Sequence, residues 1–184
     1  MATMHDERLQ QQIAYYRARA PEYDEWFLRQ GRYDHGAEWN ARWFAEVEEL
    51  RQQLARFNPA GDILELACGT RWWTSQLVQY ANRLTAVDAS AEALAIHRKR
   101  LENRPIDYIQ ADLFTWQPEP RYDVVFFSFW LSHVPPERFA AFWAGVPVAL
   151  RPDGRIFFID PLGSELFRKE ITTVAHTHSF NAGD

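Results

Sequence analysis

The sequence predicts an α/β fold in which a mainly parallel sheet is flanked by helices. After residue 58, short apolar runs of strand length alternate with segments whose apolar residues recur at helical spacing. Strands separated by helices favour a parallel sheet that is covered on both faces. Because such sheets bind ligands beyond the carboxyl ends of their strands, we expect the functional residues just after each strand.

The first 58 residues are predicted to form helices on either side of a loop marked by Gly31 and Gly36. Apolar residues recur at helical spacing in the first segment and share one face in the second. They are Leu9, Ile13 and Tyr16, and then Trp39, Trp43, Val47, Leu50 and Leu54.

Residues 59–160 are predicted to hold five strands and three helices in the order β-α-β-α-β-β-α-β. The helices are expected over 72–80, over 91–103 with Ser90 as N-cap, and from Pro135 and Pro136 to Leu150, before a turn at 151–154. The strands are expected at DILELA (62–67), RLTAVD (83–88), IDYIQADLF (106–114), YDVVFFSFW (122–130) and RIFFID (155–160).

Composition narrows the functional classes. The net charge is -5 with both signs mixed along the chain, so we expect no nucleic-acid partner. The single Cys68 cannot form an internal disulfide, and the start MATMHDERLQQQ lacks the apolar stretch of a signal peptide, which favours a cytoplasmic protein. No apolar run approaches the ~20 residues of a membrane helix, so no membrane insertion is expected.

Three strand ends carry residues suited to binding an adenosine-containing ligand. Small residues after Glu65 would let a ligand approach backbone N–H groups, Asp88 could accept from ribose hydroxyls, and Asp112 could accept from an adenine amino group. Each has a plainer interpretation: a strand-to-helix turn, a capping acid and a surface turn. The series of all three at one sheet edge favours the binding interpretation.

The segments LELACGT, TAVDAS, QADLF and FFSFWLSHVP resemble, in this order, four motifs of the class I S-adenosylmethionine-dependent methyltransferases. The resemblance covers roughly residues 10 to 160 and implies a Rossmann-like fold with S-adenosyl-L-methionine as cofactor. One methyltransferase domain would then comprise a helical lid at 1–58, a cofactor-binding core at 59–160 and a short tail at 161–184.

The resemblance also implies roles for individual residues. Glu65 and Gly69 would shape the pocket for the methionine end, Asp88 would bind the ribose, and Asp112 with Leu113 would hold the adenine. Ser128 to Trp130 would close the pocket beside the sulfonium. The full set of expected cofactor-binding residues is Tyr16 and Arg19 in the lid, Glu65, Ala67, Gly69, Thr70, Arg71, Asp88, Ala89, Asp112, Leu113, Phe114, Ser128 and Trp130; no metal site is expected.

Two features depart from the family pattern. Arg71 stands where the first motif commonly has a second glycine, so its side chain must point outward, pair with the cofactor carboxylate or occupy the site. The tail is too short for the usual terminal antiparallel strand pair, and 171–180 offers at most one strand. The apolar strand at 155–160 would then be an exposed edge that pairs with the tail or with another chain in a homo-oligomer.

The favoured function is methyl transfer to a small-molecule acceptor by in-line displacement, aided by holding donor and acceptor in near-attack geometry. His133, after the fourth strand, is the candidate base, although a structural histidine explains it equally well. The alternative is a catalytically silent cofactor-binding or interaction protein. A nicotinamide dehydrogenase is a weaker third option, because the glycine turn lacks G-x-G-x-x-G.

Overall fold

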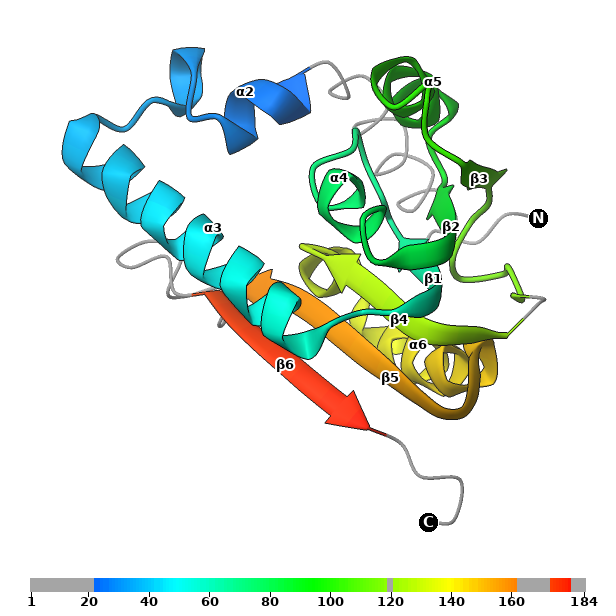
Figure 1. Ribbon diagram of the computed structural model, residues 1–184. Helices are drawn as coiled ribbons and strands as arrows, with labels where there is room; N and C mark the ends of the chain where they lie inside the picture. The colour runs from blue at the N-terminus through cyan, green and yellow to red at the C-terminus, as the bar shows by residue number, and fades with distance from the viewer. Residues whose placement is uncertain (1–21, 119–120, 162–172, 180–184) are drawn as a thin grey trace.

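The computed structural model describes residues 22–118, 121–161 and 173–179, and its centre is a six-stranded sheet in the order β3-β2-β1-β4-β5-β6 (Figure 1). The first five strands pair in parallel, whereas β6 runs antiparallel to β5. The strands are β1 (Gly61–Leu66), β2 (Ala81–Asp88), β3 (Ile106–Gln110), β4 (Tyr122–Ser128), β5 (Leu150–Pro161) and β6 (Thr173–Ser179). The predicted α/β fold with a mainly parallel sheet is therefore confirmed.

Helices precede β1 and connect β1 to β2, β2 to β3 and β4 to β5, whereas the described part of the connection from β3 to β4 contains none. The α-helices are α2 (Tyr23–Phe27), α3 (Ala37–Phe57), α4 (Thr74–Leu77), α5 (Ala91–Arg100) and α6 (Pro136–Ala149), and the 3-10 helices are η2 (Gly31–Tyr33) and η3 (Leu131–His133). Ser90 caps α5 as predicted, since its side chain accepts from the backbone N–H of Ala93. Within the described ranges, none of the helices has both the length and the apolar character needed to cross a membrane.

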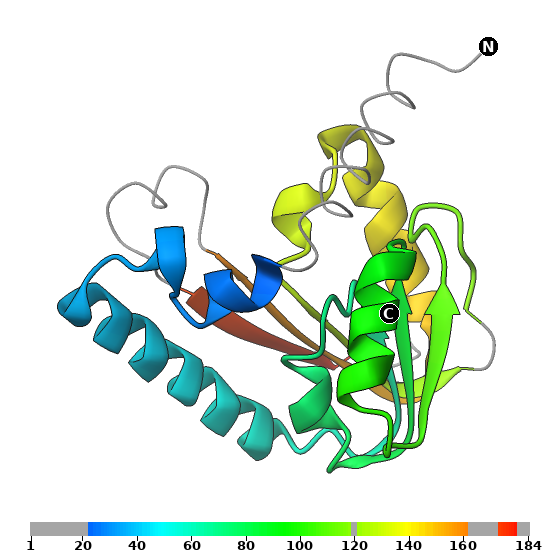
Figure 2. The same ribbon diagram turned by 90° about the horizontal axis from the view of Figure 1, so that it is seen from above.

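The two faces of the sheet are covered by different helices, as Figure 2 shows for α3 and α6. Alternate residues of each strand point to opposite faces. Ile63 and Phe126 therefore pack with Leu50 and Leu77 from α3 and α4. Leu64, Leu66, Val125 and Phe127 pack against Phe142, Val146 and Ala149 of α6 on the opposite face. The sheet thus forms the middle layer of the core.

Helix α3 agrees with its predicted apolar face except at its start. Trp43, Leu50 and Leu54 are buried, but Trp39 is 47% exposed. The helix begins only at Ala37, so Trp39 lies in its first turn, away from the sheet that buries the later positions. Helical spacing alone could not distinguish this end from the rest.

Several predicted boundaries were wrong. The helix expected over 72–80 is reduced to α4, because Arg71 has a φ of 126° before it and β2 begins at Ala81 directly after it. The third and fourth strands end earlier than expected, at Gln110 and Ser128. Strand β5 starts at Leu150, so the expected turn at 151–154 lies inside it as an irregularity opposite Tyr122 and Val124.

The predicted exposed edge at 155–160 is covered from within the chain. Residues from Arg155 to Pro161 pair with β6, from Ser179 to Thr173. The sequence predicted that this edge pairs either with the tail or with another chain, and the structure has the pairing with the tail. The short tail thus supplies one antiparallel strand that covers the edge of β5, and a homo-oligomer stays a prediction.

Candidate active site

The turn after β1 has an unusual backbone. Ala67, Gly69 and Arg71 all have positive φ angles, of 52°, 57° and 126°. The N–H of Gly69 donates to Oδ2 of Asp88 over 2.9 Å. A Cβ built on Gly69 would meet no atom within 4 Å, so the space in front of this residue is open. The turn therefore exposes backbone where a ligand could approach closely.

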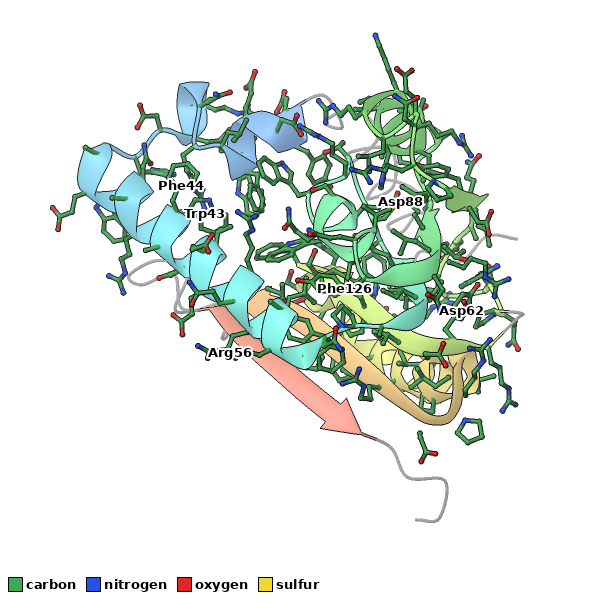
Figure 3. The ribbon with its side chains drawn as sticks, in the orientation of Figure 1. Trp43, Phe44, Arg56, Asp62, Asp88 and Phe126 are labelled. Carbon is green, nitrogen blue, oxygen red and sulfur yellow. The ribbon has the colours of Figure 1, made fainter. Side chains whose placement is uncertain are left out.

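Asp88 ends β2 beside this turn, and Figure 3 shows it above Asp62, which lies near the start of β1. Its Oδ1 accepts from the N–H of Ser90 over 2.8 Å, while its Oδ2 accepts from Gly69. Burial raises the pKa of Asp88, although the backbone N–H groups of Ser90, Gly69 and Ala89 oppose the shift. These bonds orient the carboxylate and leave further lone pairs for hydroxyl donors.

Glu65 lies inside β1, one strand from Asp88. It is only 2% exposed, and its Oε2 is buried without a hydrogen-bond partner in the described part of the chain. Burial, with a smaller contribution from the charge of Asp88, raises the pKa of Glu65 to about 8, although the Thr74 side chain opposes the shift. A buried carboxyl without a counter-charge is suited to receive a positive group.

The loop after β3 lies against the end of β2, because the N–H of Ala111 donates to the carbonyl of Asp88 over 3.1 Å. Oδ1 of Asp112 accepts from the N–H of Phe114 over 2.9 Å, which fixes a tight turn. The ring of Phe114 lies 5.5 Å from that of Trp130. Leu113, Phe114 and Trp130 all pack on the core face that α6 covers. The expected adenine side is thus next to the loop after β4.

The loop after β4 is held by backbone contacts to β5. The N–H of Phe129, with a φ of 52°, donates to Ile159 over 2.7 Å, and the N–H of Leu131 donates to Oδ2 of Asp160 over 2.6 Å. Burial raises the pKa of Asp160, although backbone N–H groups oppose this. His133 ends η3 in this loop, and burial lowers its pKa, so its imidazole is neutral near pH 7.

Through α2, the N-terminal region reaches the turn after β1 at residues 67–71, the cofactor turn that the resemblance implies. Oδ1 of Asp24 accepts from Oγ1 of Thr70 over 3.2 Å, and both carboxylate oxygens accept from Arg100 of α5, over 2.8 and 2.6 Å. Phe27 stacks on Trp72 at 4.0 Å. Sequence reasoning missed Asp24 and Arg100, because 46 and 76 residues separate the partners and no motif links them.

Arg71 shows how the departure from the glycine pattern is accommodated. Its guanidinium lies 5.9 Å from the centre of the Trp72 ring, and its Nε is buried without a hydrogen-bond partner. Among the described residues, no carboxylate forms an ion pair with it. The side chain thus lies along the neighbouring aromatic ring, while the backbone takes the conformation that glycine would favour.

The structure brings most of the predicted site residues to one edge of the sheet. The segment 65–71, Asp88 with Ala89, the turn at 112–114 and the segment 128–130 all lie at or just beyond the carboxyl ends of neighbouring strands. Tyr16 and Arg19 lie outside the described residues. The orphaned Glu65 oxygen, the open space at Gly69 and the oriented Asp88 carboxylate fit a ligand with a cationic end and vicinal hydroxyls, as S-adenosylmethionine has.

Comparison with known proteins identifies the family. The model of a family described as "Methyltransferase domain" matches residues 63–154, which is half of the chain. The chain belongs to the class I S-adenosylmethionine-dependent methyltransferases. The matched residues run from β1 into β5 and include every predicted core motif of this methyltransferase.

Solved structures and a curated relative agree with this assignment. A structure described as a DhpI–SAH complex is 36% identical, has a TM-score of 0.70 and aligns over 94% of this methyltransferase and 79% of that chain. The N-methyltransferase NodS from Bradyrhizobium japonicum, 19% identical, has a TM-score of 0.61 over 68% of this chain and 74% of its own, and shares the fold. Nodulation protein S from Azorhizobium caulinodans is 28% identical over 102 residues, 55% of this chain and 49% of that protein. The methyltransferase thus spans about half the length of this curated relative.

Proposed function

We propose that this chain binds S-adenosyl-L-methionine and transfers its methyl group to a small-molecule acceptor, with the whole of 1–184 acting as one methyltransferase domain. The observation that carries the proposal is the open space in front of Gly69, whose N–H donates to the Asp88 carboxylate, together with the buried Glu65 carboxyl on the neighbouring strand. DhpI, 36% identical in one structure and 34% in another, is described in complexes with SAH and with SAM and HEP, which supports the same ligand class here.

In this proposal, each end of the cofactor meets a different part of the site. The Glu65 carboxyl would face the ammonium of the methionine end, and Asp88 would accept from the ribose hydroxyls. Asp112 and Leu113 would hold the adenine, with Phe114 against its face. Ala67, Thr70 and Ala89 belong to the turns that would contact the cofactor, and Ser128 and Trp130 would close the sulfonium side.

The acceptor side is supported by aromatic contacts between α2, α3 and the loop after β4. The ring of Phe129 lies 5.3 Å from that of Trp26 and 6.3 Å from that of Trp43. Trp43 is itself fixed, because its indole N–H donates to the carbonyl of Phe27 over 2.9 Å. Rings held in this way can enclose a small acceptor and exclude water.

S-adenosylmethionine supplies a methyl group on a sulfonium, whose C–S electron pair stays on sulfur as the acceptor's lone pair forms the new bond. The protein's contribution is to hold the two reactants in line. His133, neutral near pH 7, would take the proton from an acceptor that must lose one. We expect His133→Ala to leave cofactor affinity unchanged but to slow turnover of such acceptors roughly a hundredfold. An equal rate at every pH would assign His133 a structural role.

The proposal is tested in two steps. Calorimetry with S-adenosylmethionine and S-adenosylhomocysteine measures binding. A panel of small amines, alcohols, thiols and carboxylic acids is then incubated with S-adenosylmethionine, and release of S-adenosylhomocysteine is measured. Binding with product release above that of Asp88→Ala supports the proposal. Failure to bind either ligand contradicts it.

The second candidate, a catalytically silent cofactor-binding protein, is favoured by Arg71 at the position where the family commonly has glycine. Its guanidinium has no acidic partner among the described residues and lies beside the cofactor turn. Cofactor binding without turnover across the whole panel, in both the wild type and Arg71→Gly, would favour this candidate.

A further inference from the structure

A buried histidine supports the cofactor turn from behind. His97 lies on α5 and is fully buried, with 0% of its surface exposed. Its Nδ1 lies 3.3 Å from the carbonyl oxygen of Gly69. Because a carbonyl oxygen can only accept, Nδ1 must carry the proton and donate this bond. In the neutral ring, Nε2 is then an acceptor, and it is buried without a partner in the described part of the chain.

The surroundings of His97 keep this ring neutral. Burial, together with the charges of Arg100, Arg71 and Arg98, lowers its pKa to about 4, although the hydrogen bond to Gly69 opposes the shift. The ring of Tyr108 from β3 packs edge-on against the His97 ring at 5.1 Å. The Tyr108 hydroxyl is also buried without a partner among the described residues. Burial and the arginines of α5 and of the turn after β1 therefore outweigh the bond to Gly69 and disfavour a second proton.

The bond from His97 determines how the peptide between Gly69 and Thr70 is turned. In a trans peptide, the C=O and the following N–H point in opposite directions. Since the Gly69 carbonyl points back to α5, the N–H of Thr70 points away from α5. No hydrogen bond joins that N–H to another described residue. The peptide on the other side of Gly69 is held separately, because its N–H donates to Asp88.

We propose that His97 is a positioning residue for cofactor binding. Its Nδ1–H holds the Gly69 carbonyl, so that the Thr70 N–H and the open face of Gly69 are presented to the methionine end of the cofactor. This inference rests on the proposed function, because it assumes that the cofactor occupies the space in front of Gly69. The role is a geometric one, since His97 is shielded from any ligand by the turn it supports.

The test compares variants with and without the donor. His97→Leu removes the donor and keeps an apolar side chain, whereas His97→Asn keeps an N–H close to the position of Nδ1. We expect His97→Leu to bind S-adenosylhomocysteine about tenfold more weakly, as for one lost hydrogen bond, and His97→Asn to recover most of the loss. Tyr108→Phe is the matched control, because it removes the neighbouring buried hydroxyl and should leave affinity unchanged. Adenosine, which lacks the methionine end, should bind equally to all four proteins.

A spectroscopic measurement on the unmutated protein covers the case in which a variant fails to fold. Long-range proton–nitrogen NMR of the histidine rings should show His97 in the tautomer protonated at Nδ1. A ring protonated at Nε2, or equal S-adenosylhomocysteine affinity in wild type and His97→Leu, would overturn this inference alone. If the wild type binds no S-adenosylhomocysteine, the proposed function fails, and this inference fails with it.

Discussion

Acidic residues at the two ends of the sheet differ in whether a cation pairs with them. At the amino ends of β1 and β4, Arg151 donates to Asp62 over 2.7 Å and to Asp123 over 2.6 Å. Burial tends to raise the pKa of Asp123, but the N–H of Asp62 and the side chain of Arg151 outweigh it and lower the pKa. At the carboxyl ends, burial raises the pKa of Glu65 and of Asp88, and among the described residues no cation pairs with either.

This difference distinguishes residues that stabilise the fold from residues that are suited to bind a ligand. A carboxylate paired with arginine has its electrostatic requirement met within the protein. A buried carboxyl that lacks a counter-charge destabilises the free protein, and a ligand with a complementary group can relieve that cost. Changes at the carboxyl end should therefore affect binding and the pH dependence of stability, whereas changes at the amino end should affect stability alone.

The largest expected effect is that of Asp88→Ala on cofactor affinity. The variant removes the acceptor proposed for two ribose hydroxyls, which should cost about 2 kcal/mol, or roughly thirtyfold in the Kd for S-adenosylhomocysteine. Calorimetry provides the measurement, and Asp107→Ala, an exposed acid on β3, is the control. An unchanged Kd for Asp88→Ala would remove Asp88 from the site.

Glu65→Gln should change both the pH dependence of stability and the affinity. Folding raises the pKa of Glu65 from 4.5 to about 8, so its protonation contributes stability that is full below pH 4.5 and is lost as the pH rises through about 8. The wild type should lose thermal stability across this window relative to Glu65→Gln, which does not titrate. S-adenosylhomocysteine should bind Glu65→Gln about tenfold more weakly. A constant difference in Tm between pH 5 and 8.5 would contradict the raised pKa.

Arg71→Gly should have a smaller effect, in the favourable direction. Glycine adopts a φ of 126° without the strain of a side chain, and the change removes a buried Nε that has no described partner. We expect a higher Tm and an equal or higher affinity for S-adenosylhomocysteine. A tenfold loss of affinity would instead make Arg71 a direct ligand of the cofactor carboxylate.

Arg151→Ala at the amino end should have the smallest effect. Its side chain is 42% exposed, so the pairs that it forms with Asp62 and Asp123 are screened by solvent and salt. We expect a slightly lower Tm at low salt, little difference at 1 M salt, and an unchanged Kd for S-adenosylhomocysteine. A change in Kd would contradict the proposal that the amino end of the sheet affects stability but not cofactor binding.

Local patterns in the sequence were sufficient to predict the α/β class, the order of strands and helices along the chain and the positions of the strand-end acids. These features depend on local patterns: apolar runs of strand length, the N-cap at Ser90, and acids such as Asp88 that directly follow a strand. The spacing of residues on α5 also indicates that one of its polar side chains is buried. His97 shares the buried face of α5 with Ala93 and Leu94, at the spacing that marks a residue facing the core.

The extent of each element and the contacts between distant residues depend on tertiary packing. The short α4 depends on where β2 must start to pair with β1, and the pairing of β6 with β5 depends on the path of the tail. The contact of Asp24 with Thr70 and Arg100, and that of His97 with Gly69, join segments separated by 28 to 76 residues. Such contacts are set by the packing of elements against one another, and a local pattern of residues carries no information about them.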